Sequence, residues 1–536
     1  MLGKPTEVEL KLGVAPEDIA TLRNHPHFTG SLHNPTREML DSVYFDSGDR
    51  FLRDNGLSLR VRHIDDKRVQ TIKSTDRGAG FFERSEWEGA IEGDQPDLSR
   101  VTDTALSRIL VDEVRQTLKP VFETRIERTA YHLNGNGADI VMAIDEGQIL
   151  ATGCSRPISE IELELKHGRP ADLFKIARDI VDIVPAHLEF KSKSERGYEL
   201  VERTPVAAET ACDLELSAGM SAGRTFTLVG RACLRHLVAN VAAMISRDEN
   251  AVHQMRVALR RLRAAISLFS PVVGDDRADA IKTELKWLAL ELGSARDLDT
   301  LLFEVIKPLR NQHKNEPGLV SISNMFMRKR TKSYRQAQDA VQSARFRKLV
   351  LDTAEWVEAG PWSASEDALI RARREMPIEI FAAAQLSQRC KKIRRRGARI
   401  NDLGTEQLHE LRIQVKKARY ATEFFSGVYH GKSARRCKKI RSSLMQLQEY
   451  LGRLNDIATH EALFADIIAG PGRGLTEEQS RRRAFAAGLI IGGQQAQIQR
   501  LLVRARKAYS RFNRAKAFWK LPGRSSTAPP EAEKKL

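Results

Sequence analysis

This chain of 536 residues has few of the residues that make disulfides or structural metal sites. Its five cysteines are odd in number, scattered, and never in CxxC spacing. That pattern argues against a disulfide framework and against a zinc site. The cysteines are Cys154, Cys212, Cys233, Cys390 and Cys437.

Long apolar segments are also missing. No run of 18 apolar residues occurs, and the first residues lack the charged and then apolar pattern of a secretory signal. We therefore expect a protein of the cytoplasm that does not act in a membrane.

Aromatic residues make up only 6% of the chain, and the glycines show no Walker spacing, so the sequence does not support a P-loop. No aromatic-rich, purine-sized site is visible in residues 1–200, which favours a small inorganic substrate over a nucleotide. Tyr44 and Trp87 are interpreted as packing residues.

Charge is abundant but unevenly distributed. Residues 1–200 hold 27 basic and 35 acidic side chains, a net charge of −8, and the rest of the chain holds 60 and 35, a net charge of +25. A chain of this length exceeds what one hydrophobic core supports, so two or three domains are expected. The split predicts an acidic module that needs metal cations to handle an anion, and a basic module that attracts polyanions directly.

Residues 7–12, Glu-Val-Glu-Leu-Lys-Leu, alternate charged and apolar side chains. In a β-strand this alternation places Glu7, Glu9 and Lys11 on one face. Two carboxylates and an ammonium group are costly to bury unless they meet metal or phosphate. The alternative for this segment alone is an edge strand with a solvated charged face.

Recurrence of the pattern favours the buried alternative. Residues 159–166 place three more carboxylates on one strand face. Seven or eight such strands predict an antiparallel β-barrel with a polar interior, which an anion and a divalent metal would occupy together. Further short segments with this period, many of them separated by turn residues, lie at 59–62, 70–73, 84–88, 123–128 and 141–145.

Residues 1 to about 200 resemble the CYTH domain, the triphosphate tunnel metalloenzyme family. Its hallmark ExExK strand is seen here as Glu7, Glu9 and Lys11, and the resemblance continues through the later strands to residues 191–198. The resemblance implies a charged tunnel in an α+β domain, Mg²⁺ or Mn²⁺ as cofactor, and inorganic triphosphate as substrate.

Residue roles follow from the same resemblance. Glu7, Glu9 and Lys11 are the expected catalytic residues. The expected metal ligands are Glu7, Glu9, Asp145, Glu160 and Glu162, with Glu86 as a further candidate. The expected phosphate-binding cations are Lys11, Arg60, Arg62, Lys73, Arg125 and Lys193. Three alternatives stay open, since Glu88 shares the strand face of Glu86, Lys191 competes with Lys193, and Glu164 is either a ligand or solvated.

Beyond residue 221 the sequence has helical period and little glycine, and it contains a duplicated motif. Residues 253–263 (HQMRVALRRLR) match residues 409–419 (HELRIQVKKAR) position for position. Downstream, residues 292–297 match residues 451–456. The duplication predicts an all-α helical bundle made of two repeats.

Each copy of the motif places cations at steps of three and four residues, beside an apolar stripe on the same helix. Neither stripe contains an acid, whereas solvated helix faces usually mix Glu with Lys, so an anion is expected to compensate the charge. Neither histidine has a second ligand at metal spacing, which disfavours a metal site or phosphotransfer. The residues are His253, Arg256, Arg260, Arg261 and Arg263, then His409, Arg412, Lys416, Lys417 and Arg419.

Residues 220–512 resemble the CHAD domain, a histidine-containing helical module that often accompanies CYTH. The resemblance implies binding of inorganic polyphosphate along a basic surface. We expect a CYTH domain over 1–203, a linker over 204–221, a CHAD domain over 222–515 with repeats at 222–370 and 371–515, and a disordered tail over 516–536.

The expected function is metal-dependent hydrolysis of inorganic triphosphate, with polyphosphate bound by the helical half. Alternatives within the fold are a thiamine or nucleoside triphosphatase and an adenylate cyclase. A non-enzymatic polyphosphate-binding scaffold is a third, although no hallmark position carries an inert residue. Nucleic-acid binding is disfavoured because the basic stripes lack interleaved aromatics and no DNA-binding motif occurs.

Overall fold

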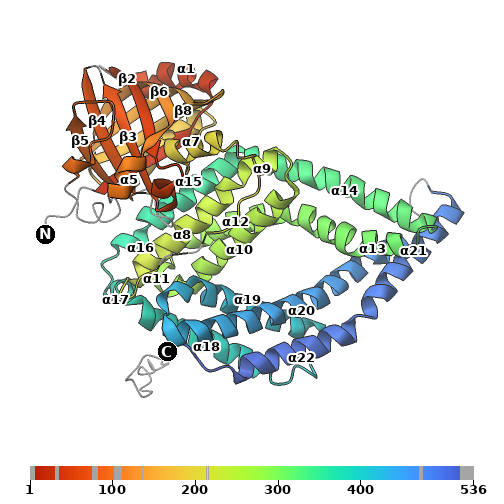
Figure 1. The fold of residues 1–536 in the computed structure, drawn as a ribbon. Helices are drawn as coiled ribbons and strands as arrows, with labels where there is room; N and C mark the ends of the chain where they lie inside the picture. Colours follow the sequence, from red (N-terminus) through yellow and green to blue (C-terminus); the bar gives the residue numbers. More distant parts are fainter. Residues whose placement is uncertain are drawn as a thin grey trace.

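A computed structural model describes residues 6–519 except 30–34, 65, 75–82, 102–111, 136, 213, 215 and 470–474. The N-terminal part is a sheet with short helices at its margins, and the C-terminal part is helical (Figure 1). The strands are β1 (Thr6–Gly13), β2 (Thr36–Asp46), β3 (Leu57–Ile64), β4 (Lys67–Ser74), β5 (Glu83–Ile91), β6 (Lys119–Gly135), β7 (Ala138–Ala151), β8 (Cys154–His167) and β9 (His187–Leu188).

The sheet is antiparallel and closes on itself. Its strand order is β5-β4-β3-β2-β6-β7-β8-β1-β9, and a further pairing of β5 with β1 joins the two sides. In such a closed sheet, successive side chains of one strand point alternately to the interior and to the outside. The predicted fold class, an antiparallel barrel followed by a helical region, is confirmed.

The outer face of β1 and β8 is apolar and is covered by helix α6 (Pro170–Ile183). Leu10, Leu12 and Leu163 are fully buried in the same core as Phe174 and Ala177 of α6. Because their neighbours along the strands must then face inward, α6 fixes Glu9, Lys11 and Glu162 in the interior of the closed sheet. The remaining described helices of this part are α1 (Pro16–Asn24), α2 (Pro26–Thr29), α3 (Phe51–Asp54), η1 (Leu98–Arg100), α5 (Asp112–Thr117) and α7 (Lys193–Val201).

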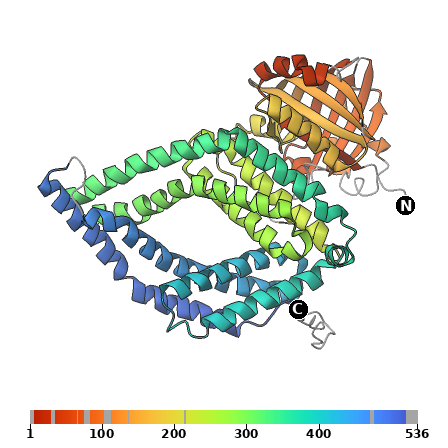
Figure 2. The ribbon, with the colours of Figure 1, turned by 180° about the vertical axis from the view of Figure 1, so that it is seen from behind.

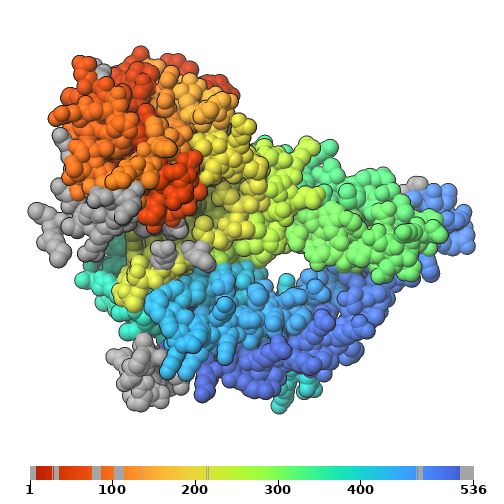
Figure 3. All heavy atoms as spheres, in the orientation of Figure 1, coloured from red at the N-terminus to blue at the C-terminus, as the bar shows by residue number. Residues whose placement is uncertain are grey.

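The helical part is drawn out to one side of the sheet (Figures 1 and 2). In the space-filling view an opening passes between its green helices and its blue helices (Figure 3). The helices are α8 (Ala222–Ala239), α9 (Val241–Ile245), α10 (Glu249–Leu268), α11 (Ser270–Val273), α12 (Asp276–Asp299), η2 (Thr300–Ile306), α13 (Lys307–Gln312), α14 (Pro317–Gln342), α15 (Ala344–Ala359), α16 (Pro361–Ala364), α17 (Ala368–Arg374), α18 (Ile378–Gly397), α19 (Thr405–Phe424), η3 (Ser426–Val428), α20 (Gly431–Ala469), α21 (Glu477–Gln495) and α22 (Ile498–Arg514).

The two parts share one apolar core and several ion pairs. Helix α6 packs on α15, where Arg178 donates to Asp352 at 3.0 Å and also pairs with Glu355. Next to this contact, Arg235 of α8 pairs with Glu195 of α7. The sheet is therefore docked on the helices through the elements that follow β8.

Two sequence expectations need correction here. Residues 516–519 were assigned to a disordered tail, but Phe518 and Trp519 are buried, and Trp519 Nε1 donates to Ser387 Oγ at 2.7 Å. Residues 520–536 lie outside the described residues. Strand β2 was not foreseen, because its 11 residues do not alternate strictly and only its second half is buried.

One stretch among the described residues, Ala222–Ile245, is long and apolar enough to cross a membrane by length and composition. Its most apolar window is 61% buried inside the fold. It comprises α8 and α9, which pack in the helical core beside α10 and α15.

Candidate functional site

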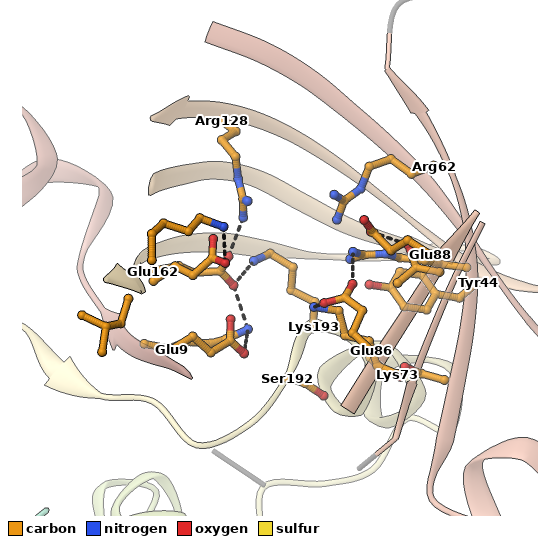
Figure 4. A pocket seen from close by; sticks show the side chains of 18 residues that line it. Glu9, Tyr44, Arg62, Lys73, Glu86, Glu88, Arg128, Glu162, Ser192 and Lys193 are labelled. Atoms are coloured by element: carbon orange, nitrogen blue, oxygen red, sulfur yellow. Dashed lines mark hydrogen bonds and ion pairs between the residues drawn. The ribbon is translucent and has the colours of Figure 1, made fainter. Parts of the chain in front are cut away.

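The interior of the closed sheet holds a charged cavity of about 610 Å³ (Figure 4). Charged groups gather on two sides of it, with Lys193 between them. Its wall comes from β1, β2, β3, β4, β5, β6, β8 and the start of α7. The lining residues are Glu9, Lys11, Tyr44, Ser58, Arg60, Arg62, Thr71, Lys73, Glu86, Glu88, Arg128, Glu162, Glu164, Leu165, Lys166, Ser192, Lys193 and Ser194.

An acidic cluster of Asp145, Glu160 and Glu162 lies at one side of the cavity. Strand register brings the carboxylates together, because Asp145 of β7 is directly opposite Glu160 of β8, and Glu162 is the next residue on the same face. Ligand oxygens of the three residues lie within 4.8 Å of one another. This is the one group of three or more potential metal ligands found among the described residues.

Lys193 occupies the centre of the acidic cluster. Its Nζ lies 2.7 Å from Asp145 Oδ2 and 2.9 Å from Glu162 Oε1, and it also pairs with Glu160. Burial opposes the charged form of Lys193, but the three carboxylates outweigh burial and raise the pKa of the ammonium group. Lys193 is thus held charged at neutral pH.

Local sequence explains how α7 delivers Lys193. Ser192 and Glu195 form a capping box, in which Ser192 Oγ accepts from the Glu195 backbone N–H and Glu195 accepts from the Ser192 backbone N–H. The cap makes Lys193 the first residue of the helix. Gly197 then allows the helix to lie against β6, because a Cβ there would sit 2.2 Å from the Phe122 ring.

Two further cations bind the acidic cluster from the strands. Arg128 of β6 donates to Asp145 through Nε and Nη2, both at 2.7 Å, and Lys11 Nζ lies 2.7 Å from Glu162 and 3.4 Å from Glu9. Burial alone would raise the pKa of Glu162, but Lys11, Lys193 and Arg128 hold it well below its usual range. Glu162 is therefore ionised, and the cluster is a network of paired charges.

The opposite side of the cavity is predominantly basic. Lys73 Nζ lies 2.9 Å from Glu86, and Arg60 lies 3.8 Å from the same carboxylate. Arg62 makes only a long contact, 3.4 Å to Ser42 Oγ, among the described residues. Burial, together with Arg60 and Arg128, lowers the pKa of Arg62 to about 10. An incoming anion would be stabilised most by this poorly compensated guanidinium group.

Most of the residues predicted for the barrel converge here. Six of them, Glu9, Lys11, Arg60, Arg62, Lys73 and Glu86, line the cavity. Glu162 and Lys193 also line it, and Asp145 and Glu160 are fully buried behind them. Both Glu88 and Glu164, left open from the sequence, line the cavity too. The side chain of Glu7 lies outside the described residues.

Arg125 is a wrong prediction for the interior. Its side chain is 59% exposed and pairs at 3.4 Å with Glu123, which is also exposed. Arg128, three positions along β6 and hence on the other face, is the inward cation. Lys191, the alternative to Lys193, pairs with Glu199 and Glu209 and does not line the cavity.

Three contributors were missed from the sequence. Arg128 could have been found from strand parity, since register sets it opposite Asp145. Arg196 pairs with Glu160 from one helical turn beyond Lys193, which no strand pattern shows. Tyr44 was interpreted as packing and does stack on Phe122 with ring centroids 4.4 Å apart. It also lines the cavity, where Arg60 and Arg62 outweigh the opposing effect of burial and lower the pKa of its hydroxyl.

The two duplicated basic stripes form the second candidate site. The stripe of α10 and the stripe of α19 lie close together, since α10 packs on α19 and Arg260 Nε lies 3.4 Å from Tyr420 OH. Burial and then Arg260, Arg412, Arg263 and Arg256 lower the pKa of Lys416 to about 8. Cations of both helices therefore repel one another at one surface, which we call the paired ridge. Its residues are His253, Arg256, Arg260 and Arg263 of α10 with His409, Arg412 and Lys416 of α19.

Acids from other helices flank the paired ridge. Arg256 lies 3.2 Å from Asp297 of α12. On α20, burial and the nearby Asp297 raise the pKa of Asp456, although Arg412 acts in the opposite direction. His253 is neutral, because burial and the nearby arginines lower its pKa to about 4. His409 Nδ1 lies 2.5 Å from Asn455 Oδ1.

Not every predicted cation belongs to the paired ridge. Arg261 is buried, pairs with Glu423 and stacks over the Phe424 ring at 5.4 Å, so its assignment to a ligand surface is wrong. Arg261 lies between the ridge residue Arg260 and the core residue Leu262. One step along the helix turns its side chain about 100° away from Arg260, so that it points into the core. Lys417 faces Arg389 and Lys392 of α18. Arg419 pairs with Glu423 at 2.9 Å.

A further basic groove of about 1030 Å³, here called the outer groove, runs between α20 and α22. No carboxylate lines it, and no ion pair to any of its cations is found among the described residues. The groove lies on a different face of α20 from Gly452, which approaches Arg412 of the paired ridge. Its cations are Arg435, Lys438, Lys439, Arg506, Lys507, Arg511 and Arg514.

With this geometry in place, comparison with known families identifies the class of protein. Residues 5–198 match the CYTH domain and residues 229–465 match the CHAD domain. The chain therefore carries a CYTH domain followed by a CHAD domain.

Three known proteins are similar to parts of the chain. The chain is 32% identical over 203 residues to a Haemophilus influenzae protein named inorganic triphosphatase, covering 36% of this chain and 54% of that protein. The chain thus spans about half the length of this curated relative. The CHAD domain of Ricinus communis is 27% identical with a TM-score of 0.47, covering 56% of this chain and 96% of that structure. A putative adenylyl cyclase from Hippeastrum, described as having a dominant triphosphatase activity, is 18% identical with a TM-score of 0.30, covering 36% of this chain and 95% of that structure.

Proposed function

We propose that the CYTH domain hydrolyses inorganic triphosphate in a metal-dependent reaction and that the CHAD domain binds inorganic polyphosphate. The observation that carries the first part is the charged cavity, in which a buried acidic cluster faces the cations Arg60, Arg62 and Lys73. A short, highly charged anion with a bound divalent cation complements both sides at once. The name of the Haemophilus relative agrees with this substrate.

The acidic cluster fits a hard divalent cation. Three carboxylates within 4.8 Å of one another are the oxygen ligands that Mg²⁺ or Mn²⁺ prefers, and Glu9 is linked to them through Lys11. Asp145, Glu160, Glu162 and Glu9 would hold the ion. When bound, such an ion neutralises phosphate charge and acidifies a bound water. Because Lys193 already contacts all three carboxylates, its ammonium group competes with a cation for the same oxygens.

The protein's own residues supply positioning and charge neutralisation. In phosphoanhydride hydrolysis negative charge spreads over the oxygens of the transferred group, so preorganised cations lower the barrier. Arg62 and Arg60 are rigid donors whose geometry matches two phosphate oxygens at once. Lys11, Lys193 and Arg128 lie beside the acidic cluster and are placed to hold the other end of the chain. The ring of Tyr44 closes the wall between the two arginines and Phe122.

Inorganic triphosphate is preferred over nucleotide substrates because, among the described residues, only Tyr44 brings an aromatic ring to the cavity lining. A nucleoside or thiamine moiety would find few apolar or stacking partners among these residues. Triphosphate, thiamine triphosphate and ATP should be compared with Mg²⁺ and with Mn²⁺, while phosphate, pyrophosphate and cyclic AMP are followed. We expect triphosphate to give the highest kcat/KM and no cyclic AMP to form.

A matched pair of variants tests the site within the same assay. Glu9→Gln removes one carboxylate that faces the cavity, and we expect kcat to fall at least about 100-fold with the fold intact. Glu123→Gln, on the outer face of β6, is the control and should retain activity. Normal turnover by Glu9→Gln would refute the site. A chain that binds polyphosphate but hydrolyses none of the three substrates would be a scaffold instead.

The polyphosphate proposal rests on the paired ridge. The helices that pack together carry His253, Arg256, Arg260, Arg263, His409, Arg412 and Lys416. Burial and then like-charge repulsion lower the pKa of Lys416, and a polyanion would relieve the repulsion. The proposed domains remain 1–203 and 222–515, with residues 204–221 as the linker, the repeats at 222–370 and 371–515, and the cytoplasm as the location. Along the linker, Ala208 and Glu209 donate backbone bonds to Asp248 and Asn240.

A further inference from the structure

A cleft of about 360 Å³ lies where the CYTH and CHAD domains meet, and we call it the junction cleft. It is built from residues far apart in the sequence. Leu188 of β9 and Arg196 of α7 come from the sheet side, while Val238 of α8 and Phe346 of α15 come from the helical side. Its volume is in the range of small-molecule sites, which often occur at domain interfaces.

The junction cleft is amphipathic. One wall is apolar and includes Val238, Val241, Ile245, Phe346 and Val350. Ile245 remains 45% exposed, so part of this wall is open to solvent. The other residues include five cations and a single carboxylate, Glu189.

Most of the cations already have acidic partners. Arg156, Lys191, Arg196 and Arg235 pair with glutamates of the CYTH domain or the linker. Arg347 differs, because its Nη1 donates only to the backbone oxygen of Gln342, at 2.6 Å, and no carboxylate pairs with it among the described residues.

Donor atoms without partners point to an anion. The Nε atoms of Arg347 and Arg196 are buried, and neither has a hydrogen-bond partner. Arg196 is only 8% exposed, so bulk water has little access to this donor. Both guanidinium groups act electrostatically on the ring of His187, which also lines the cleft. The two arginines therefore both lie near His187 in the lining of the cleft.

We propose that the junction cleft binds a small amphipathic anion, an alkyl or acyl chain with one phosphate or carboxylate head. The head would accept hydrogen bonds from Arg347 and Arg196, and the chain would cover the wall formed by Val241, Ile245 and Phe346. A nucleotide fits less well, because most of the wall is aliphatic and, among the described lining residues, only Gln342 offers an uncharged side-chain amide that could hydrogen-bond a base.

The position of Arg196 connects this cleft with the charged cavity. Its guanidinium group pairs with Glu160, a member of the acidic cluster, and the same side chain lines the junction cleft. Arg235, another lining residue, pairs with Glu195, which caps the helix that carries Lys193. An anion in the cleft thus competes for two side chains that position the acidic cluster, and this effect on hydrolysis rests on the proposed function.

Titration calorimetry of the full chain with octyl phosphate, kept below its micelle concentration, tests the site without relying on activity. We expect saturable binding that excess triphosphate does not displace. Octanol, which lacks the head, and inorganic phosphate, which lacks the chain, should each bind at least about tenfold more weakly. The ratio of octanoate to octyl phosphate affinity identifies the preferred head, and either preference supports the site.

Three variants locate the binding. Arg347→Gln should weaken the binding of octyl phosphate at least about tenfold. Ala242→Phe, which fills the cleft from α9, should weaken its binding as much. Lys348→Gln removes a neighbouring exposed cation of α15 outside the cleft and should leave affinity within about twofold. Three results would overturn the proposal. These are no binding of octyl phosphate, its displacement by triphosphate, and binding by both cleft variants that is as tight as binding by the parent chain. None of these results would touch the triphosphatase proposal.

The link to the cavity has its own readout. Saturating octyl phosphate should change kcat for triphosphate at least about twofold in the parent chain and not in Arg347→Gln. Saturable binding with no change in kcat would overturn the link while leaving the binding site intact.

Discussion

Side-chain parity decides which cations of strand β6 act in the charged cavity. Arg125 and Arg128 are three residues apart, so they project from opposite faces. Arg128 makes a bidentate pair with buried Asp145, whereas Arg125 meets only exposed Glu123. A charged strand read without its register therefore suggests the wrong arginine.

Glutamine substitutions at these two positions test the orientation of β6. Arg128→Gln leaves Asp145 short of a partner, and we expect kcat/KM to fall at least about 30-fold and the unfolding free energy to fall by about 3 kcal/mol. Arg125→Gln removes a solvent-screened pair, so both quantities should change little. Steady-state kinetics and urea denaturation measure the two effects. Equal losses in the two variants would contradict the assigned faces.

At the scale of elements, packing places the paired ridge on α10 and α19 and separates it from the outer groove on α20 and α22. Both surfaces are basic, but their cations have different surroundings. Burial and then like charges lower the pKa of Lys416 in the ridge to about 8. The outer groove holds its cations without an acidic side chain in its lining. Net charge alone would predict similar polyphosphate binding by both surfaces.

Two quadruple variants distinguish location from charge. Replacing Arg256, Arg260, Arg412 and Lys416 with Ala should weaken long-chain polyphosphate at least about 100-fold and spare triphosphate hydrolysis. Replacing Arg435, Lys438, Arg511 and Arg514 with Ala removes the same charge from the outer groove. We expect this second variant to lose less than about tenfold in affinity for long-chain polyphosphate. Polyphosphate affinity should be measured at matched salt, with duplex DNA as competitor. Equal losses of affinity in the two variants would contradict specific binding at the paired ridge.

The pH dependence of that binding is a second readout. A polyanion stabilises the charged form of Lys416, so affinity should be highest below about pH 8 and fall as pH rises through that value. Lys416→Arg keeps its charge at alkaline pH and should lose this dependence. A wild-type affinity that stays constant between pH 7 and about 9 would show that Lys416 is not at the site.

At the scale of the whole molecule, α6 and α7 hold the two domains together. Arg178 of α6 reaches Asp352 and Glu355 of α15, and Arg277 of α12 lies 2.7 Å from the same Glu355. The apolar core continues from β1 and α6 into α8 and α10. The closed sheet is therefore stabilised partly by the helices on which it docks.

Arg178→Gln should weaken this docking. Because both partners are partly buried, we expect the unfolding free energy of the sheet to fall by about 1–2 kcal/mol, seen as faster hydrogen exchange in α6 and β1. Arg277→Gln removes the other partner of Glu355 from within the helical domain and should leave exchange in β1 unchanged. Identical exchange in β1 for Arg178→Gln and the parent chain would mean that the sheet is stable without the contact.

Much of this organisation is determined by local sequence. Alternating charge predicts that Glu9 and Lys11 share a strand face, and helical spacing predicts the stripes of α10 and α19, because both periods are properties of the backbone. The capping box before Lys193 is likewise local. The division into an acidic domain and a basic domain needs only composition.

Tertiary structure alone decided which of these faces meet. Strand register placed Asp145 opposite Glu160 and turned Arg128 inward in place of Arg125, and helix packing buried Arg261 while leaving Arg260 on the ridge. No local pattern could bring Arg196 to Glu160 or join α7 to α8 at the junction cleft. Such contacts depend on the closure of the sheet and the docking of distant helices, which are set by the burial of the whole apolar core.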